Sequence, residues 1–272
     1  MVPEMVSPLP PDATSKLLPD ADDANRAVIE QADVGNLLLR HMDARNFELL
    51  CPHLARVPLK VGSDLARAGD PITTICFPEG AVAGFLDVLG DGRRLTIGLV
   101  GREGCVGWPL LMGYDRWPYD VSIRGETSTA LRIDAERFSD VAERSPEIRT
   151  LLLRFAGTFT AQMGRTIISN LIHSVEQRTA RWILLYQDRV RSEEIVVTHE
   201  ELGYMLGVRR QSVTDALHFL EGGGAIKSSR GKLVVRDRVR LETLATDTYG
   251  FAEAEYRRLI GMMCGPDNRT GS

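Results

Sequence analysis

The spacing of apolar residues changes near Pro146, and this change restricts the possible folds more than any other feature. Between Val57 and about Leu131, short apolar runs alternate with turn-forming residues, as is typical of β-strands. From Pro146 onward, apolar residues recur at intervals of three and four, which is the spacing of one helix face. The sequence therefore predicts a strand-rich domain followed by helical structure.

Turn signals recur at close intervals in the strand-rich stretch, as in a β-sandwich or barrel. They are Lys60-Val61-Gly62, Ala68-Gly69-Asp70-Pro71, Pro78-Glu79-Gly80 and Gly90-Asp91-Gly92. The Asp91-Gly92 pair predicts a tight hairpin, because its turn requires positive φ angles. Upstream, Asn36 to Leu54 has helix-compatible spacing, whereas residues 1–33 are rich in Pro, Asp and Ala and are expected to form a disordered arm.

The helical repeat after Pro146 predicts one long helix with an apolar stripe. The stripe is either a core face packed on the chain's own barrel or a seam between two copies of the chain, for which an apolar repeat near 3.5 residues is suited. We favour the seam and expect a homodimer held by five residues of the stripe. They are Leu152, Phe155, Phe159, Met163 and Ile167.

A helix-turn-helix pattern follows a second amphipathic helix, which is expected over Val175 to Arg189. Thr198-His199-Glu200-Glu201 matches the S/T-x-x-E capping box, so a helix should begin there. Gly207 falls before the next apolar run, where a glycine in the left-handed conformation allows a tight turn between two short helices. The second of these helices opens with polar side chains, at the place where a recognition helix meets base edges.

The residues expected to contact DNA lie in this motif and in a basic two-stranded wing predicted over Ala225 to Val235. They are Thr198, His199, Arg209, Arg210, Gln211, Ser212, Thr214, Asp215, Lys227, Arg230 and Lys232. Arginine can donate two hydrogen bonds to guanine, and glutamine can pair with adenine. Between Arg209 and Arg240 basic residues, Arg238 among them, outnumber acidic ones, although the net charge of the chain is −4. Such a concentrated positive face suits phosphate contact.

Composition argues against several other functions. No apolar run approaches the roughly 20 residues of a membrane span, so we expect a soluble, cytoplasmic protein that does not contact a membrane. The four cysteines are too far apart for a zinc or iron–sulfur cassette, although a redox role for one thiolate stays open. They are Cys51, Cys76, Cys105 and Cys264. No phosphate loop, nucleophile elbow or metal-ligand spacing is present, so we expect no enzyme, no metal and no cofactor.

The segments Thr198-His199-Glu200-Glu201-Leu202-Gly203 and Gln211-Ser212-Val213 resemble the Crp/Fnr transcription regulators, and the resemblance covers roughly Asn36 to Ala245. It implies an α+β chain with a jelly-roll sensor of cyclic-nucleotide-binding type, a dimerisation helix and a winged helix-turn-helix. The expected parts are an arm (1–33), the sensor (34–145), the dimerisation helix (146–173), the DNA-binding domain (174–245) and a C-terminal helix and tail (246–272). The resemblance also implies a homodimer on a palindromic double-stranded DNA operator.

The resemblance assigns roles to residues by position. The residues that would face bases are Arg210, Gln211 and Asp215. The residues that would lie near phosphates are Thr198, His199, Arg209 and Ser212. Family members often carry Arg, Glu and Arg on the base-facing helix, whereas this chain has Gln211 and Asp215 at the last two positions, so its operator sequence stays open.

The predicted sensor departs from the cyclic-nucleotide binders of the family, in which a Gly-Glu-x-Gly segment holds the ribose and an arginine pairs with the phosphate. Here Gly104-Cys105-Val106-Gly107 has cysteine in place of glutamate, and Pro118-Tyr119-Asp120 lies where the arginine is expected. A buried phosphate would lose its main charged partner, so cyclic AMP is not expected to bind in the usual way. Other arginines could substitute, and the ligand is unidentified. They are Arg94, Arg102, Arg116 and Arg124.

Three alternatives stay open. The basic motif could be a helical hairpin with solvated arginines, or an adaptor that docks a protein in place of DNA. Haem binding through a histidine or cysteine is also possible in this family, although the histidines are scattered. They are His41, His53, His173, His199 and His218. RNA polymerase would be a further partner of an activator, and the sequence identifies no surface for it.

Overall fold

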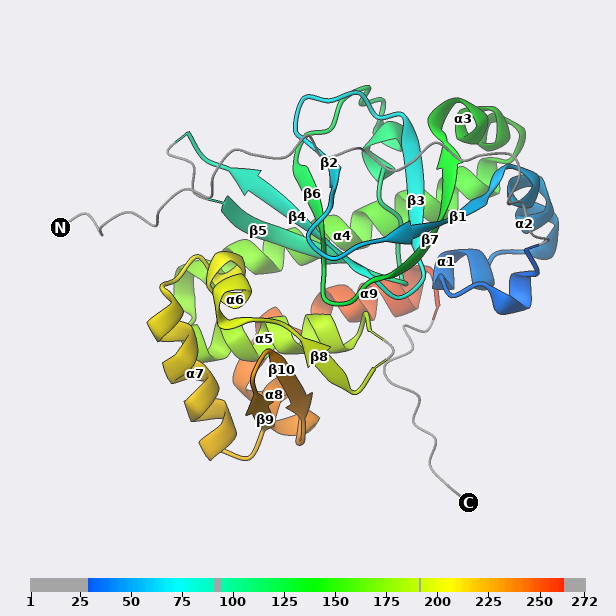
Figure 1. Ribbon diagram of the computed structural model, residues 1–272. Helices are drawn as coiled ribbons and strands as arrows, with labels where there is room; N and C mark the ends of the chain where they lie inside the picture. The colour runs from blue at the N-terminus through cyan, green and yellow to red at the C-terminus, as the bar shows by residue number, and fades with distance from the viewer. Residues whose placement is uncertain (1–28, 91–93, 191, 262–272) are drawn as a thin grey trace, which may run out of the picture.

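The computed structural model describes residues 29–90, 94–190 and 192–261 (Figure 1). In its N-terminal half, the described strands form antiparallel sheets in the orders β1-β7-β3 and β2-β6-β4-β5, which confirms the predicted jelly-roll and the α+β class. These strands are β1 (Ala55–Leu59), β2 (Asp64–Ala66), β3 (Thr74–Pro78), β4 (Val82–Val88), β5 (Arg94–Val100), β6 (Asp120–Arg124) and β7 (Ser128–Asp134). β4 and β5 pair up to Val88 and Arg94 as expected of a hairpin, and the predicted Asp91-Gly92 turn lies outside the described residues.

The stretch before the jelly-roll is helical, as its spacing predicted, and it consists of short pieces. They are α1 (Leu37–Arg40), α2 (Ala44–Leu50) and the 3₁₀ helix η3 (Cys51–His53). New helix starts cause the breaks, because the Asn36 side chain accepts from the Leu38 and Leu39 amides and the Asp43 side chain caps α2. Two further helices cover the jelly-roll, namely η4 (Trp108–Met112) and α3 (Ala135–Arg144).

The expected arm ends earlier than residue 33. Gln31 lies in the 3₁₀ helix η2 (Gln31–Asp33), and its Nε2 donates to the carbonyl oxygens of Leu39 at 3.0 Å and Met42 at 2.7 Å. Residues 29–33 therefore belong to the fold, because a side-chain amide satisfies carbonyls at the end of α1. The remainder of the expected arm, residues 1–28, lies outside the described residues.

The predicted long helix is α4 (Pro146–Ile172), which the Ser145 side chain caps and Pro146 begins. Its apolar stripe faces inward, however, and packs on the chain's own jelly-roll. The ring centroid of Phe159 lies 4.8 Å from that of Phe85 and 5.5 Å from that of Trp108. Of the five residues expected in the dimer seam, three are buried in this core, one packs partly against it, and one is exposed. They are, in that order, Leu152, Phe155, Phe159, Met163 and Ile167.

The stripe was therefore assigned to the wrong neighbour. A repeat of three and four shows which residues share a helix face, but it does not show whether that face meets the same chain or a second copy. The buried residues of α4 belong to the jelly-roll core, which agrees with the alternative that the stripe is a core face.

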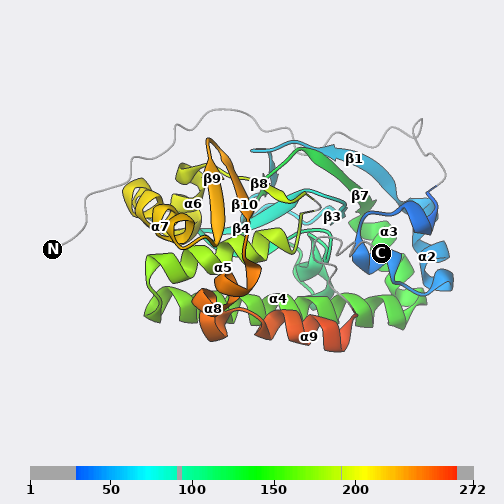
Figure 2. The same cartoon turned by 90° about the horizontal axis from the view of Figure 1, so that it is seen from below.

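The C-terminal half is a winged helix-turn-helix packed beside α4 (Figure 2). Its elements are α5 (Val175–Gln187), β8 (Glu194–Val196), α6 (His199–Leu206), α7 (Arg210–Gly222), β9 (Ile226–Ser229), β10 (Lys232–Val235) and α8 (Arg238–Ala245). The wing is a three-stranded sheet in the order β8-β10-β9, because β8 adds to the expected pair. After it come η5 (Thr246–Thr248) and α9 (Phe251–Leu259), which confirms a C-terminal helix.

The two halves share apolar surface. Val82 of β4 and Leu99 of β5 are fully buried in the core of the DNA-binding half, beside Trp182 and Leu206. None of the described helices has both the length and the apolar character needed to span a bilayer.

Candidate nucleic-acid interface

The start of α6 and the turn after it have the predicted geometry. Thr198 Oγ1 accepts from the Glu201 amide at 3.1 Å, and Glu201 Oε2 accepts from the Thr198 amide at 2.8 Å. These two bonds confirm the capping box. Gly207 ends the helix with a φ of 63°, in the left-handed region, so the tight turn that the sequence predicted is present.

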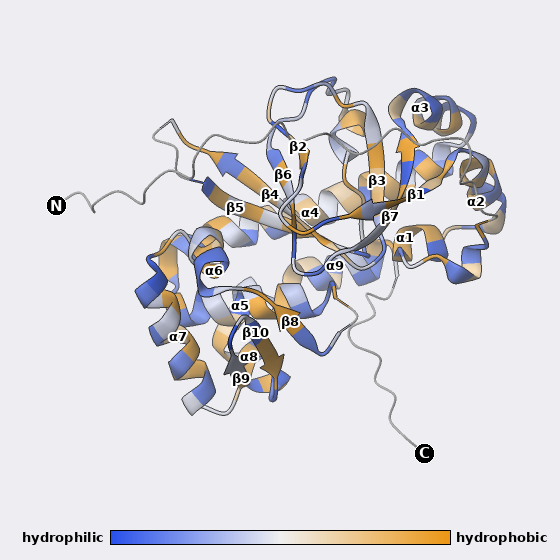
Figure 3. Ribbon diagram, in the orientation of Figure 1, coloured by the Kyte–Doolittle hydropathy of each residue, from blue (hydrophilic) through white to orange (hydrophobic). Residues whose placement is uncertain are grey.

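Helix α7 has one buried and one polar face. Val213, Ala216, Leu217 and Leu220 are buried in the domain core. Arginine, glutamine and aspartate side chains lie on the opposite side, and Figure 3 shows the resulting alternation of hydrophilic and hydrophobic segments along the helix. Of the residues predicted to contact DNA here, those exposed are Arg209, Arg210, Gln211 and Asp215, and those half-buried are Ser212 and Thr214.

Hydrogen bonds order the polar side chains around the start of α7. Gln211 Nε2 donates to Asp215 Oδ1 at 3.0 Å. Thr214 Oγ1 lies 3.0 Å from His199 Nδ1 and also donates to the Arg210 carbonyl at 3.1 Å. The structure therefore brings the predicted residues of α6 and α7 into one connected surface.

The surroundings of His199 favour the neutral form of its imidazole. Burial lowers its pKa below the ordinary value of 6.5, and the neighbouring charges of Arg210 and His218 lower the pKa further. A negatively charged group placed beside this ring would act in the opposite direction, by stabilising the imidazolium.

The wing presents basic side chains at the same end of the molecule as α6 and α7 (Figure 1). Lys227, Arg230 and Lys232 are exposed, and Gly231 makes the wing turn with a φ of 73°. Lys232 Nζ lies 2.7 Å from Glu194 Oε2 of β8, and each side chain is about half exposed. Such an exposed pair contributes little to stability, so it does not prevent Lys232 from reaching a phosphate.

Arg238 was counted in the basic face, but it points inward. Its Nη2 lies 2.8 Å from Asp188 Oδ1 and its Nε lies 2.9 Å from Glu242 Oε1. Nη1 donates to Gln187 Oε1 at 2.7 Å, and Tyr249 is a further partner. Arg238 therefore ties α8 to the end of α5. The sequence signal for this position was Glu242, four residues later, because charged residues at that spacing pair on a helix.

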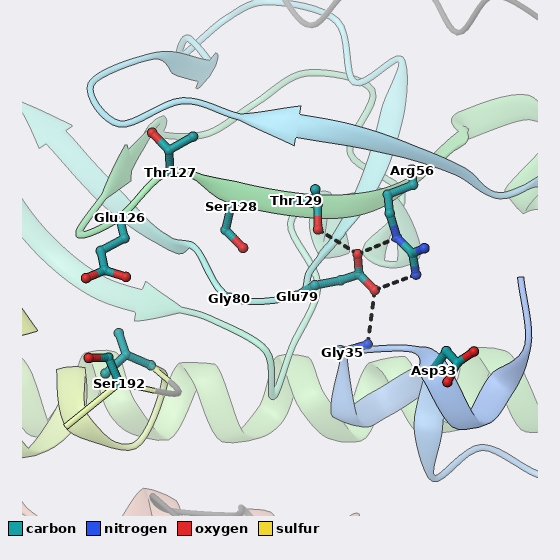
Figure 4. Close-up of a pocket in the computed structure, with 11 residues that line it drawn as sticks. Asp33, Gly35, Arg56, Glu79, Gly80, Glu126, Thr127, Ser128, Thr129 and Ser192 are labelled. Carbon is teal, nitrogen blue, oxygen red and sulfur yellow. Dashed lines mark hydrogen bonds and ion pairs between the residues drawn. The ribbon is translucent and has the colours of Figure 1, made fainter. Parts of the chain in front are cut away.

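The larger of two cavities described in the molecule has about 400 Å³ and lies between the jelly-roll and the segment after α5 (Figure 4). Glu79 accepts hydrogen bonds there from Arg56, Thr129 and the Gly35 amide. Burial alone would raise the pKa of Glu79, but these bonds outweigh burial and hold the pKa below its ordinary value.

Carboxylates dominate the lining of this cavity. Asp33, Glu79 and Glu126 line it together with the single guanidinium of Arg56. The four arginines proposed as substitutes for a phosphate-binding arginine line neither of the two cavities. The surroundings therefore disfavour an anion, because like charges would face it in a partly enclosed space.

The loop expected at a ribose site is packed tightly against α4. A Cβ added at Gly104 would lie 2.1 Å from the Phe155 ring, and Cys105 is fully buried. Burial raises the pKa of Cys76 to about 11 and raises that of Cys105 as well, so neither thiol is poised as a reactive thiolate. In the described residues, no cluster of His, Cys, Asp and Glu is suited to hold a metal ion.

Comparison with known proteins agrees with this architecture. A family model described as a Crp-like helix-turn-helix domain matches residues 177–244. The transcriptional activator protein Anr of Pseudomonas aeruginosa is 22% identical over 196 residues, covering 69% of this chain and 79% of Anr.

Solved structures of similar fold cover most of the chain. FixK2 from Bradyrhizobium japonicum has a TM-score of 0.62 at 15% identity, covering 71% of this chain and 98% of FixK2. The c-di-GMP-responsive global regulator CLP of Xanthomonas campestris has a TM-score of 0.59 at 20% identity, covering 71% of this chain and 99% of CLP. The jelly-roll, the long helix and the matched helix-turn-helix thus occur together in the order that the sequence predicted, and the chain is similar in fold to these regulators, with a Crp-like helix-turn-helix domain over residues 177–244.

Proposed function

We propose that the chain binds a palindromic DNA operator as a homodimer, with α7 in the major groove and the wing on the phosphates. The observation that carries this proposal is the outward polar face at the start of α7, opposite a fully buried apolar face. In this arrangement Arg210 reads guanine and Gln211 reads adenine, while Asp215 orients the Gln211 amide. Thr198, His199, Arg209, Ser212, Thr214, Lys227, Arg230 and Lys232 surround these residues and would contact the backbone.

The dimer seam that we now propose is the solvent-facing side of α4. Its members follow one another at intervals of four and three, which is a heptad spacing. They are Gly157, Thr160, Gly164, Ile167 and Leu171. Ile167 is 61% exposed and Leu171 is 78% exposed, and a Cβ added at Gly157 or Gly164 would meet nothing within 4 Å. Two copies of α4 could therefore approach closely at the glycines and bury the apolar end.

The proposed sensor does not take cyclic AMP in the usual way. The acidic lining of the larger cavity and the contact between Gly104 and Phe155 support this view. CLP responds to c-di-GMP, but the four arginines that the sequence offered as phosphate partners in this chain do not line either cavity, so we do not extend that ligand to it. The proposal places the protein in the cytoplasm with the DNA that it binds, and includes no enzymatic activity.

Selection of duplexes from a random pool tests the function. The expected result is a palindrome with half-sites about one helical turn apart, bound with an affinity that falls steeply as salt rises. An adaptor that docks a protein would bind no duplex at low salt, and that result would refute the proposal. A recovered site without two-fold symmetry would refute the homodimer on DNA while retaining DNA binding.

A further inference from the structure

The C-terminal helix α9 joins the two cores of the molecule. Tyr249, just before it, packs against the core of the DNA-binding half, whereas Tyr256 within it is 2% exposed in the core of the jelly-roll. The Tyr256 hydroxyl donates to the Glu103 carbonyl at 2.7 Å. The DNA-binding domain is therefore attached to the jelly-roll at its end as well as at its start, where α4 leads into α5.

Helix α9 also lies along α4, as Figures 1 and 2 both show. At the start of α9, the Arg165 guanidinium stacks over the Phe251 ring, 4.4 Å from its centroid. At the other end, Arg154 Nη1 donates to the Leu259 carbonyl at 3.3 Å. Two residues of α4 therefore hold the two ends of α9.

Buried charges reinforce the junction. Arg189, just after α5, and Glu103, in the loop after β5, form an ion pair of 2.8 Å at 3% and 2% exposure. Arg181 of α5 donates to the carbonyls of Thr248 at 3.0 Å and Gln162 at 3.2 Å, so it joins α5, η5 and α4. A partial separation of the two halves would leave some of these charges or polar atoms buried without partners, which is costly. The two halves are therefore expected to separate completely or not at all.

In this arrangement the DNA-contacting elements lie against the jelly-roll. A Cβ added at Gly207, in the turn between α6 and α7, would lie 2.9 Å from Leu95 Cδ2 of β5. The Lys232 ammonium of the wing lies 2.7 Å from Glu194 Oε2, and the negative charge of Glu126, in the turn before β7, adds to Glu194 in raising the pKa of Lys232. A duplex approaching this side would meet β5 and the Glu126 carboxylate, which repels phosphate.

We propose that α9 is a strap that holds the DNA-binding domain closed against the jelly-roll, and that tight operator binding requires α9 to leave α4. The inference rests on the DNA-binding function proposed above. A strap whose contacts form only in the closed state lowers the affinity of the protein for DNA. The reduction equals the free energy by which those contacts favour the closed state over the open one. Couplings of this kind change affinity by roughly 5- to 150-fold.

The test compares the full-length chain with a chain that ends at Tyr249 and with Tyr256→Phe, which removes only the hydroxyl bonded to Glu103. Arg258→Ala is the matched control, because Arg258 pairs with Glu255 on the exposed side of α9. Operator affinity and the radius of gyration in solution are measured for each. The shortened chain should bind roughly 5- to 150-fold more tightly and be more extended, Tyr256→Phe should shift both values less, and Arg258→Ala should change neither.

A folded shortened chain with unchanged or weaker operator binding would overturn the strap. If the shortened chain does not fold, hydrogen exchange in Tyr256→Phe decides, because an open domain must raise exchange at the amides of Val82 and Leu99, two residues that are fully buried in the core of the DNA-binding half. Unchanged exchange at both amides would then overturn the strap. Failure of every variant to bind any duplex at low salt would refute the DNA-binding proposal, while scattering and exchange would still test the strap.

Discussion

At the scale of single residues, base recognition depends on how neighbouring side chains share hydrogen bonds. The bond from Gln211 Nε2 to Asp215 Oδ1 fixes the direction of the Gln211 amide. The second N–H of that amide and its Oε1 remain available, which is the donor and acceptor pair that adenine requires. If Gln211 contacts DNA as proposed, its amide is already oriented, so little side-chain entropy would be lost on binding.

Arg210→Ala should reduce operator affinity by about 1–3 kcal/mol and relax the preference at one base position, because a bidentate contact to guanine is lost. Lys232→Ala should instead weaken all duplexes about equally and make the salt slope shallower by about 1. Titration of both variants against the operator and single-base variants of it measures the difference. An Arg210→Ala chain that keeps full base preference would contradict the assignment.

His199 predicts a dependence on pH. Because burial and nearby cations lower its pKa below 6.5, the stability that neutral His199 contributes is present above pH 6.5 and is lost as pH falls through its lowered pKa. A DNA phosphate beside the ring would raise that pKa, so operator affinity should increase as pH falls from about 7.5 to about 6.

Binding measured across this pH range in the native chain, in His199→Gln and in His53→Gln, a second control whose histidine lies in η3 of the jelly-roll, tests the point. His199→Gln should show a flatter profile, and His218→Gln serves as the first control, since His218 lies nearby and is exposed. Identical profiles in the native chain and His199→Gln would contradict a phosphate contact at this residue.

At the scale of elements, α4 has a buried apolar face and an outer face with an exposed apolar end. The inner face carries Leu152, Phe155 and Phe159 into the jelly-roll core, whereas the outer face ends in the exposed Ile167 and Leu171. The sequence predicted the helix and its periodicity correctly. It could not separate the faces, because both repeat at three and four and burial depends on elements distant in sequence.

These two faces should respond differently to substitution. Leu152→Ala should reduce the free energy of unfolding by roughly 2–5 kcal/mol, because it leaves a cavity in the core. Leu171→Glu should instead produce monomers with little loss of monomer stability, since a charge would enter the seam. Sedimentation and thermal unfolding measure the two effects, with Val239→Glu, at a 72% exposed site of α8, as control. A dimeric Leu171→Glu chain would contradict the proposed seam.

The reading of the DNA-binding elements succeeded because their signals are local. The capping box at Thr198 and the left-handed Gly207 depend on residues within one helical turn, and the structure confirms both. The third wing strand β8 and the inward position of Arg238 were missed, because each depends on a partner that folding brings close. The predicted contacts with DNA and the domain limits remain predictions.

At the scale of the whole molecule, the buried ion pair between Glu103 and Arg189 links the two halves. Glu103→Leu alone should destabilise the chain by roughly 3–5 kcal/mol, because it leaves the Arg189 charge buried and unpaired. The double substitution Glu103→Leu with Arg189→Met should recover much of that loss, since both charges are removed. Denaturant unfolding of the single and double variants measures this. A double variant no more stable than Glu103→Leu would contradict the account.

Val82 and Leu99 limit how far the two halves of the chain can be separated from each other. These two side chains of the jelly-roll complete the core of the DNA-binding half. Expressing the halves separately would therefore expose an apolar patch on each of them. A chimaera that joins this jelly-roll to the DNA-binding domain of another protein would therefore also need the residues of α5 and α6 that cover Val82 and Leu99. Without them, the exposed apolar surface would favour aggregation.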